Sequence, residues 1–415
     1  MKIFKRIIKY FLALTTLSIL LFIIYLNYEK FTSDTRIGNI EKYGESLEDI
    51  SLSGENKILA IGEGTHGTKE FQEIKLKILK KMVNENNYRN ILIEAGYGET
   101  KLINDYVSGN KNIKDFKNFQ LQYPVYNTKQ MREMLNWIRD WNITHSKDSR
   151  INVFGFDMQN PNASLSNILE YCDKNKIKIN EQDKKILNNL IHNKEPISKK
   201  KARSILKSLS SVKKALGDEE SKNQKESLDM EFNEVEQAMQ TWLSDKDYNL
   251  LRDQFMYENI KQIIKNNDNK TLLFGHNEHI AKKNKDYKVM GEYLKSQFGE
   301  KYFAIGTSFY KGSVNIKIMS ENKRKDISFN STDPMAAQAK YFPKKSYYIN
   351  ILNVNNRDEE INNVIGNNNR IISVGEGYSS FMKLLPDSYR PKVILKDKYD
   401  GMIYFYETNP IKILE

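Results

Sequence analysis

Five ionisable residues of the sequence follow short apolar runs, and their types suit the transfer of protons. An imidazole is the side chain best matched to proton transfer near neutral pH, and a neighbouring carboxylate can fix its tautomer and raise its basicity. The pattern therefore indicates acid–base chemistry carried by histidines with carboxylate partners. The five residues are Glu63 and His66 after Ile58 to Ile61, Glu94 after Ile91 to Ile93, Asp157 after Asn152 to Phe156, and His276 after Thr271 to Phe274.

The segment around His66 reads Gly62-Glu63-Gly64-Thr65-His66-Gly67. Glycines in such a turn permit unusual backbone angles and let the backbone approach a ligand closely. Glu63 lies three residues from His66, and Glu94 lies one expected strand away. Either carboxylate is therefore a candidate partner that orients the imidazole.

The segment Phe274 to His279 (FGHNEH) places two histidines three residues apart, His276 and His279. On the first turn of a helix they would lie on a common face. Two histidines near carboxylates also describe a metal site, although zinc usually takes His-Glu-x-x-His or cysteine ligands, and the chain has one cysteine, Cys172. We expect no metal and no cofactor, and metal-dependent chemistry stays open as an alternative.

Structural explanations compete with the catalytic ones. A carboxylate after a strand often caps the next helix by accepting its backbone N–H groups, which is an open alternative for Glu94 and Asp157. His145 and His192 stand in polar stretches, where we expect surface residues. The sequence has no Gly-x-Ser-x-Gly elbow, and Cys172 lies in a charged helical stretch. Direct attack by an activated water is therefore the more economical mechanism.

The elements that must position these residues alternate brief apolar runs with amphipathic segments, which is typical of α/β folds. Residues 71–86 have the apolar spacing of a helix. We expect a mainly parallel central sheet with flanking helices, whose C-terminal strand ends converge on one crevice. The expected strands are Ile58 to Ile61, Ile91 to Ile93, Asn152 to Phe156, Thr271 to Phe274, Phe303 to Thr307 and Ile371 to Val374.

Composition divides the chain into an anchor at residues 1–30, a linker with a short helix at 31–56, and one domain at 57–415. From about residue 162 to 265 the chain is rich in Lys, Asn, Glu and Ser without a strand-like run, which predicts a helical insertion. After Phe309 the signals weaken, and short runs at 346–352 and 402–406 suggest mixed strands that close the fold. Residues 375–378 either line the crevice or turn the chain, and we favour the turn.

The N-terminal segment predicts a membrane helix. Basic residues precede the uncharged stretch Tyr10 to Tyr28, which at about 1.5 Å per residue can cross a hydrocarbon core of roughly 30 Å. No small-residue cleavage site follows, which favours an uncleaved anchor over a removed signal peptide, the alternative. Positive charge at the N-terminus predicts a single-pass protein of the cell membrane whose C-terminal domain is extracytoplasmic. The formal net charge is +12, of which residues 1–30 contribute +4. The remaining +8 is spread along the chain, so we expect no nucleic-acid partner.

Taken jointly, the motifs resemble those of the erythromycin esterase family, over about residues 50 to 410. The joint match is specific, whereas each motif alone would not be. The matching pieces are Gly62 to Gly67 with Glu70-Phe71, Ile93-Glu94, Gly155-Phe156-Asp157, Leu251-Arg252-Asp253 with Met256 and Asn259, and Gly275-His276-Asn277 with His279.

The resemblance implies an α/β core with a helical insertion, and a hydrolase that opens the ester of a macrolactone without a metal or a covalent intermediate. His66 looks like the general base of the family, and Glu63 and Glu94 look like the carboxylates that hold and polarise it or the water. His276, with His279 as a second candidate, resembles the residue that stabilises the oxyanion or protonates the leaving alkoxide.

The remaining expected binding residues are Lys75, Arg252 and Asp157. Arg252 resembles the Arg-Asp pair before the last strand of the site; the alternative is a buried ion pair with Asp253 or another neighbour. Lys75 stands where the family usually has arginine, nine residues after His66. Lysine keeps the charge but lacks the planar fork for bidentate contacts, so the substrate need not be a macrolide.

The sequence thus favours a membrane-anchored extracytoplasmic hydrolase of a carboxylic ester or macrolactone, with a small-molecule ester as its partner. The alternative is a non-catalytic or metal-dependent surface protein that binds an anionic, lipid or polysaccharide ligand in the same crevice. The pairing of His66 with carboxylates separates the two, because a site for anions would not contain Glu63 and Glu94.

Overall fold

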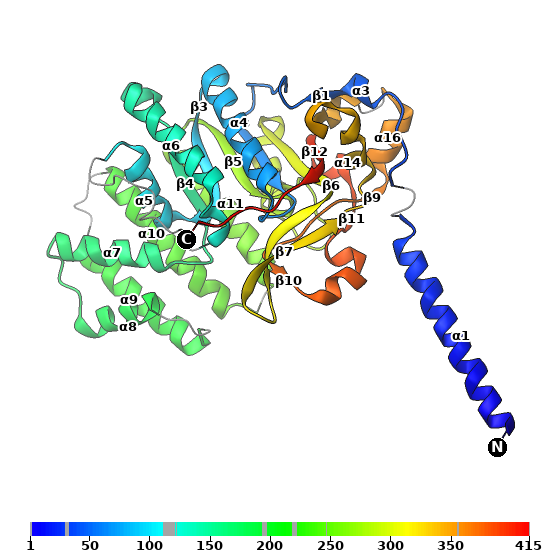
Figure 1. Ribbon diagram of the computed structural model, residues 1–415. Coiled ribbons are helices and arrows are strands. Elements are labelled where there is room, and N and C mark those ends of the chain that lie inside the picture. The colour runs from blue at the N-terminus through cyan, green and yellow to red at the C-terminus, as the bar shows by residue number, and fades with distance from the viewer. Residues whose placement is uncertain are drawn as a thin grey trace. The chain divides into compact units, whose positions relative to one another are not determined.

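A computed structural model describes residues 2–29, 33–110, 121, 123–192, 197–217, 222–245, 247–354 and 357–414 (Figure 1). The chain divides into two compact units. The larger unit comprises Ser51–Thr307, Asp397–Asp400 and Ile411–Glu415. The smaller unit comprises Met1–Ile50, Ser308–Lys396 and Gly401–Pro410.

The larger unit contains parallel strands in the order β6-β2-β5-β3-β4, where β6 contributes its first part. Their apolar runs are buried, as expected for parallel strands covered on both faces. The register places Glu63 of β2 opposite His276 of β5. The C-terminal ends of these two strands therefore lie level. The bounds are β2 Ile58–Glu63, β3 Tyr88–Gly96, β4 Asn152–Asp157, β5 Lys270–His276 and β6 Tyr302–Ile318.

Helices connect these strands (Figure 1). α4 follows β2 and buries the face that the sequence pattern predicted, including Phe71, Ile78 and Met82. α6 begins after Thr128, whose hydroxyl accepts the N–H of Met131 as an N-cap. The bounds are α4 Lys69–Asn86, α5 Tyr97–Val107, η2 Pro124–Tyr126, α6 Lys129–Thr144, η3 Lys147–Ser149, α12 Asn277–Ile280, α13 Met290–Phe298 and η4 Gly299–Lys301.

Between β4 and β5 the described residues form helices α7 to α11, in the region where the composition predicted helices. α7 to α10 share an apolar core that contains Leu169, Ile205, Val235 and Met239. Cys172 is fully buried in that core. The bounds are α7 Asn162–Lys174, α8 Glu181–Ile191, α9 Lys199–Leu216, α10 Lys222–Leu243 and α11 Tyr248–Asn266.

The smaller unit makes the sheet mixed, so the prediction of a mainly parallel sheet was wrong. Here the strand order is β1-β8-β12-β6, with β1 and β12 antiparallel to β8. The second part of β6 pairs antiparallel with β7 and parallel with β10, and β9 pairs antiparallel with β11. Antiparallel neighbours need only a short turn, whereas parallel ones need a long crossover. The strand bounds are β1 Gly44–Ser46, β7 Lys323–Asn330, β8 Ser346–Asn350, β9 Asn368–Arg370, β10 Gly377–Tyr378, β11 Lys392–Ile394 and β12 Gly401–Thr408.

Two other local expectations differ from the structure. The run Ile371 to Val374, which lies between β9 and β10 in the chain, does not form one of the strands of the sheets. Its apolar side chains are nevertheless buried. The segment that we assigned to a turn contains β10, and Glu376 beside it pairs with Arg324. The remaining helices of the smaller unit and at its boundary are α3 Ile40–Tyr43, α14 Pro334–Gln338, η5 Ala339–Tyr341, η6 Pro343–Lys345, α15 Ile351–Val354, α16 Glu359–Gly366, η7 Ser380–Leu384, η8 Pro386–Ser388 and α17 Leu395–Lys398.

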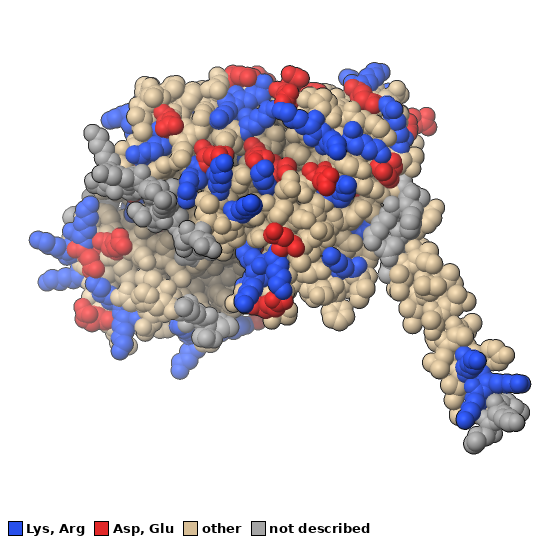
Figure 2. All heavy atoms as spheres, viewed as in Figure 1, with Lys and Arg blue, Asp and Glu red and all other residues tan. Residues whose placement is uncertain are grey.

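The first helix, α1 (Lys2–Asn27), has the length and composition of a membrane span. Its apolar part, Phe4–Tyr25, has 22 residues and a mean hydropathy of 2.3, and none of it is buried. Figure 2 shows this helix as an uncharged shaft with Lys and Arg near its N-terminal end. It is therefore a candidate membrane anchor or signal sequence.

Candidate active site

The turn that carries His66 lies between β2 and α4 and is fixed by Thr307 of β6. The N–H of Gly64 donates to Thr307 Oγ1 at 3.1 Å, and Thr307 Oγ1 donates to the carbonyl of Gly62 at 2.9 Å. Asn277 in turn holds the backbone N–H and carbonyl of Thr307. A Cβ at Gly62 would lie 2.2 Å from Asn277 Oδ1, so this close approach requires glycine.

Glu63 is the carboxylate that contacts His66. His66 Nδ1 lies 3.1 Å from Glu63 Oε2, and Lys75 Nζ lies 2.7 Å from Glu63 Oε1. Glu63 and Lys75 are buried, whereas the His66 side chain is 15% exposed. Burial alone would raise the pKa of Glu63, but Lys75 and His66 outweigh it and lower that pKa below its ordinary value. An ionised Glu63 accepts the Nδ1 proton, which leaves the basic lone pair on His66 Nε2.

His276 faces His66, with 5.1 Å between the ring centroids. It is the N-cap of α12, and its Nδ1 accepts the N–H of Glu278 at 3.4 Å. Its Nε2 is buried and has no hydrogen-bond partner among the described residues. Burial, with the charges of His66 and His279, lowers the pKa of His276 to about 4. The ring is therefore neutral near pH 7, with the proton on Nε2, so Nε2–H can donate a hydrogen bond into the site.

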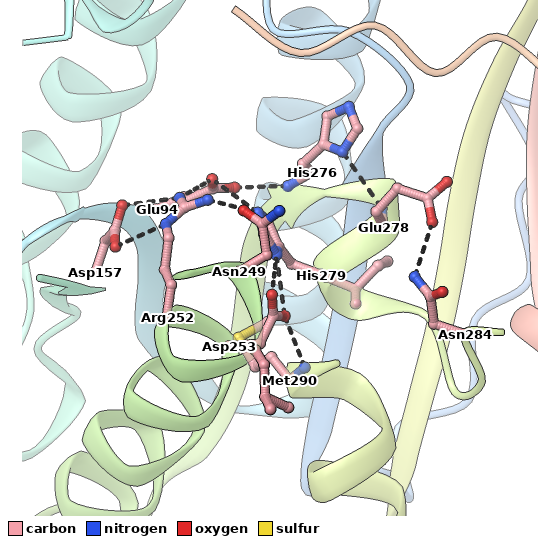
Figure 3. Close-up of polar contacts among 12 residues, drawn as sticks. Glu94, Asp157, Asn249, Arg252, Asp253, His276, Glu278, His279, Asn284 and Met290 are labelled. Atoms are coloured by element: carbon pink, nitrogen blue, oxygen red, sulfur yellow. Dashed lines mark hydrogen bonds and ion pairs between the residues drawn. The ribbon is translucent and has the colours of Figure 1, made fainter. Parts of the chain in front are cut away.

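A second network surrounds Arg252 of α11 (Figure 3). Its guanidinium donates to Glu94 Oε1 at 2.7 Å and to the two carboxylate oxygens of Asp157 at 2.9 and 3.2 Å. It also donates to His279 Nε2 at 2.9 Å. The other oxygen of Glu94 accepts the backbone N–H of His276 at 2.7 Å. Through Glu94 this network fixes the backbone of His276.

The charges of this network stabilise one another. Burial would raise the pKa of Glu94, but His279 and Arg252 lower it strongly, so Glu94 is ionised. Burial opposes a charged His279, and Asp253 and Glu94 outweigh it and raise its pKa. His279 Nδ1 lies 3.0 Å from both oxygens of Asp253. The Nδ1 proton of His279 therefore faces Asp253, and the ring lies between Asp253 and Arg252.

The capping alternatives do not describe Glu94 and Asp157. Helix α5 has Gly96 at its N-cap and α7 has Pro161, neither with a capping side chain. Asp157 accepts the N–H of its neighbour Met158 besides the guanidinium of Arg252. The expected ion pair of Arg252 exists, but with Glu94 and Asp157 rather than with Asp253.

The structure thus brings two groups of sequence-predicted residues together. Glu63, His66, Lys75 and His276 form one group, and Glu94, Asp157, Arg252 and His279 form the other. His145 and His192 are exposed, as expected. Among the described residues, no group of three or more His, Cys, Asp or Glu is arranged to hold a metal ion.

Sequence reasoning assigned no site role to three residues that hold the site. Asp253 was considered only as a partner of Arg252, yet it binds His279 and accepts the N–H of Met290 at 2.8 Å. Adjacent helical residues point in different directions, so the pair Arg252-Asp253 could have been predicted to bind two separate partners. The other two residues are Thr307 and Asn277, which fix the turn that carries His66. The only sequence signals for them were the position of Thr307 at the end of an expected strand and the position of Asn277 directly after His276.

Comparison with known proteins adds the family. The sequence model of the erythromycin esterase family matches residues 83–408, most of the chain. The chain belongs to the erythromycin esterase family. The matched region contains Glu94, Asp157, Arg252, His276 and His279 and begins after His66.

Relatives of this erythromycin esterase family member extend over nearly the whole chain. The putative hydrolase YbfO of Bacillus subtilis is 20% identical over 95% of this chain and 98% of its own. A crystal structure of a Bacillus cereus protein has a TM-score of 0.73 and 23% identity, covering 91% of this chain and 98% of that one. A variant of the erythromycin esterase EreC, crystallised in its open conformation, has a TM-score of 0.62 and 14% identity. The match covers 87% of this chain and 93% of that one. The structures show a shared mixed α/β fold, and the family indicates a hydrolase of small molecules.

Proposed function

We propose that the protein hydrolyses a carboxylic ester or macrolactone through a water that His66 activates. The observation that carries this proposal is the facing pair of histidines with opposite hydrogen-bonding roles. Glu63 holds the proton of His66 on Nδ1, so that Nε2 can accept one from water. His276, 5.1 Å away between ring centroids, is neutral and has a buried Nε2–H donor that no described residue accepts.

The proposed reaction has two proton transfers. His66 Nε2 takes a proton from water, and the resulting hydroxide attacks the ester carbonyl carbon. The carbonyl oxygen becomes an oxyanion, which accepts a hydrogen bond from His276 Nε2–H. When the tetrahedral intermediate collapses, the C–O bond to the alcohol breaks, and the imidazolium of His66 returns its proton to the leaving alkoxide. One ester and one water thus give one acid and one alcohol.

The charged residues around the histidines have positioning roles in this proposal. Glu63 stabilises the imidazolium of His66, and Lys75 keeps Glu63 ionised. Lys75 is 4% exposed and its Nζ forms an ion pair with Glu63, so in this proposal the lysine acts on Glu63 rather than on the substrate. Arg252, Asp157 and His279 fix Glu94 and through it the backbone N–H of His276.

The proposal places the enzyme at the membrane, with the catalytic unit outside the cytoplasm. The support is the exposed apolar helix α1 and the basic residues at its N-terminal end, because positive charge is retained on the cytoplasmic side. In that location the enzyme meets esters outside the cytoplasm.

The test is hydrolysis of a panel of macrolides and aryl esters by the full chain, with and without a chelator. We expect turnover that the chelator does not change. His66→Ala should lower kcat/KM by about a hundredfold or more, the usual contribution of a general base. His145→Ala is the matched control, because His145 is exposed at the C-terminal end of α6, and it should retain full activity.

Two outcomes would contradict the proposal. Loss of activity with the chelator, restored by a divalent metal, would favour the metal-dependent alternative. A folded chain without turnover of any ester would favour a binding protein, and ligand binding to the crevice would then be measured directly.

A further inference from the structure

Four large apolar side chains of the smaller unit are exposed on neighbouring segments. Met319 at the turn between β6 and β7 is 70% exposed, and Phe381, Leu384 and Leu385 in and after η7 are 70%, 62% and 61% exposed. Outside α1, the described residues have no other place with three such side chains within five positions. Exposed apolar side chains that cluster on neighbouring segments mark a candidate interaction site. We call these four residues the apolar patch (Figure 1, η7 in orange near β11).

Backbone contacts join the two parts of the apolar patch. The N–H of Met319 donates to the carbonyl of Tyr378 at 3.1 Å, three residues before Phe381. A Cβ at Gly377 would lie 3.2 Å from Met319 Sδ, so the methionine lies directly over this strand. The β6–β7 turn and the segment that leads into η7 are therefore one surface.

Lysines border the apolar patch. Lys317, Lys323 and Lys383 are exposed, and among the described residues no carboxylate lies within ion-pair distance of them. The nearby acids are occupied: Glu321 pairs with Lys325, Glu376 with Arg324 and Asp387 with Arg370. The border therefore carries unbalanced positive charge, which complements an anionic surface.

The apolar patch is connected to the end of α1 by a short series of ion pairs. Glu29, two residues after α1 ends, pairs with Arg370 of β9 and with Lys392 of β11, the latter at 3.0 Å. Arg370 also pairs with Asp387, at 2.5 Å, and Asp387 is two residues after Leu385. Where α1 leaves a membrane, the apolar patch is thus one arginine side chain and a few backbone residues away.

We propose that the apolar patch is a second membrane contact, which inserts into the interface of an anionic bilayer beside α1. The inference rests on the membrane anchoring in the proposed function. Apolar side chains gain free energy by leaving water at the headgroup boundary, and lysines at the border bind anionic headgroups. With this contact the smaller unit lies against the bilayer in a fixed orientation. With α1 alone it would be attached at one point and free to reorient.

The test measures lipid contact at single positions of the full chain. The one cysteine, Cys172, is buried, so an introduced cysteine at an exposed position reacts selectively with a thiol-specific fluorophore. The label is placed at Leu384→Cys, at Phe22→Cys in α1, and at Leu352→Cys, an exposed control on α15 of the same unit. Each chain is reconstituted in vesicles of phosphatidylcholine with phosphatidylglycerol that contain lipids spin-labelled near the headgroups.

We expect quenching at Leu384→Cys at least about threefold stronger than at Leu352→Cys, and weaker in vesicles without phosphatidylglycerol. Adding Lys383→Glu should reduce the quenching at Leu384→Cys. Quenching at Phe22→Cys with equal, low quenching at the other two positions would overturn the patch contact and leave the anchor intact. No quenching at any position would overturn both. Disulfide cross-linking of unlabelled Leu384→Cys chains, without lipid quenching of the labelled chains, would overturn the membrane contact and assign the patch to a second copy.

Discussion

Lys75 acts on the proposed catalytic group through Glu63. Both side chains are buried, and their charged atoms lie 2.7 Å apart. Removing one partner of a buried ion pair leaves an uncompensated charge, which costs roughly 3–5 kcal/mol of stability. Because Glu63 in turn contacts His66, the proposed catalytic base and the stability of the fold depend on the same lysine.

For Lys75→Ala we expect a lower free energy of unfolding and at least a tenfold lower kcat/KM. Lys75→Arg should retain much of the stability and of kcat/KM, since arginine keeps the positive charge. Without Lys75 the pKa of Glu63 rises, so the acid limb of the pH–rate profile should move to higher pH. Urea denaturation and pH–rate profiles measure these effects, with Lys77→Ala on the exposed face of α4 as the control. Identical behaviour of Lys75→Ala and Lys77→Ala would contradict the ion-pair role.

The lowered pKa of Glu63 determines how the stability of the fold changes with pH. A carboxyl whose pKa is lower in the folded state stabilises the fold above its ordinary pKa of 4.5, and this contribution is lost as the pH falls through the folded value. In Lys75→Ala the folded and unfolded pKa values of Glu63 become closer. The acid-dependent part of the stability should therefore shrink.

His276 gives an acid-dependent stability change of different origin. The unfolded chain takes up a proton on this histidine near its ordinary pKa of 6.5, whereas the folded chain takes it up only near pH 4. Stability therefore falls as the pH falls through this window. Relative to His276→Gln, the wild type should lose about 3 kcal/mol between pH 7 and pH 4, measured by denaturant unfolding. A difference independent of pH would refute the lowered pKa.

The same substitution separates hydrogen bonding from charge in catalysis. Glutamine keeps an N–H donor, so His276→Gln should retain more activity than His276→Ala. His276→Ala should lose about a hundredfold to a thousandfold in kcat, as expected for an oxyanion donor. Equal losses in the two variants would show that His276 acts in another way.

At the scale of elements, α10 and α11 connect the region between β4 and β5 to the site. α11 supplies Arg252 and Asp253 to partners on β3, β4, α12 and the start of α13. α10 supplies Glu234, whose Oε2 accepts the N–H of Gly98 at 3.0 Å and the hydroxyl of Ser164 at 2.5 Å. These contacts join α10 to the beginnings of α5 and α7.

The Glu234 contact should make the stability of the fold around α10 decrease as the pH rises from acidic to neutral values. Burial raises the pKa of Glu234 to about 8, against the hydrogen bonds from Ser164 and Gly98, so the folded chain holds a neutral carboxyl near pH 7. The unfolded chain releases this proton above pH 4.5, and stability therefore falls as the pH rises from 4.5 to about 8. Glu234→Gln removes this pH dependence. At pH 8 its free energy of unfolding should exceed that of the wild type by roughly 4 kcal/mol at most.

Unfolding by urea at several values between pH 5 and pH 9 measures the gain. Glu236→Gln is the control, because Glu236 lies on the same helix and its side chain is 33% exposed. A gain that is the same at pH 5 and pH 9 would contradict the raised pKa. A similar pH dependence in both variants would assign the effect to helix charge rather than to burial.

At the scale of the whole molecule, the proposed location depends on α1, the candidate membrane anchor. Its apolar stretch of 22 residues suffices to cross a bilayer, and Lys5, Arg6 and Lys9 stand on its N-terminal side. In a bacterial host the full chain should stay in the membrane fraction after alkaline carbonate extraction. Protease added outside the cytoplasmic membrane should digest it.

A matched variant tests the orientation. Lys5→Glu, Arg6→Glu and Lys9→Glu together should protect a larger fraction of the chain from external protease, because positive charge sets the cytoplasmic end. An intact mass that lacks the N-terminal segment, with the remainder soluble, would identify a cleaved signal sequence instead.

Local periodicity and chemistry determined the elements of the larger unit. The apolar runs predicted β2, β3, β4 and β5, and the spacing in residues 71–86 predicted α4. They succeed because a strand buried on both faces and a helix buried on one face each have a local apolar pattern. The joint motifs predicted the family from the same local signals.

The tertiary structure decided what depends on strand order, register and side-chain packing. The sheet is mixed because β8 pairs antiparallel with β1 and β12, which are far from it in the chain, through contacts that no local pattern encodes. The sequence left Glu63 and Glu94 equivalent as partners of His66. In the packed structure Glu63 contacts His66, whereas Glu94 is bound by Arg252 and by the backbone N–H of His276. Arg252 binds Glu94 and Asp157 because folding brings a helix beside strands about 95 to 158 residues away in the chain. A side chain's type is local, but its partner is fixed only when the core packs.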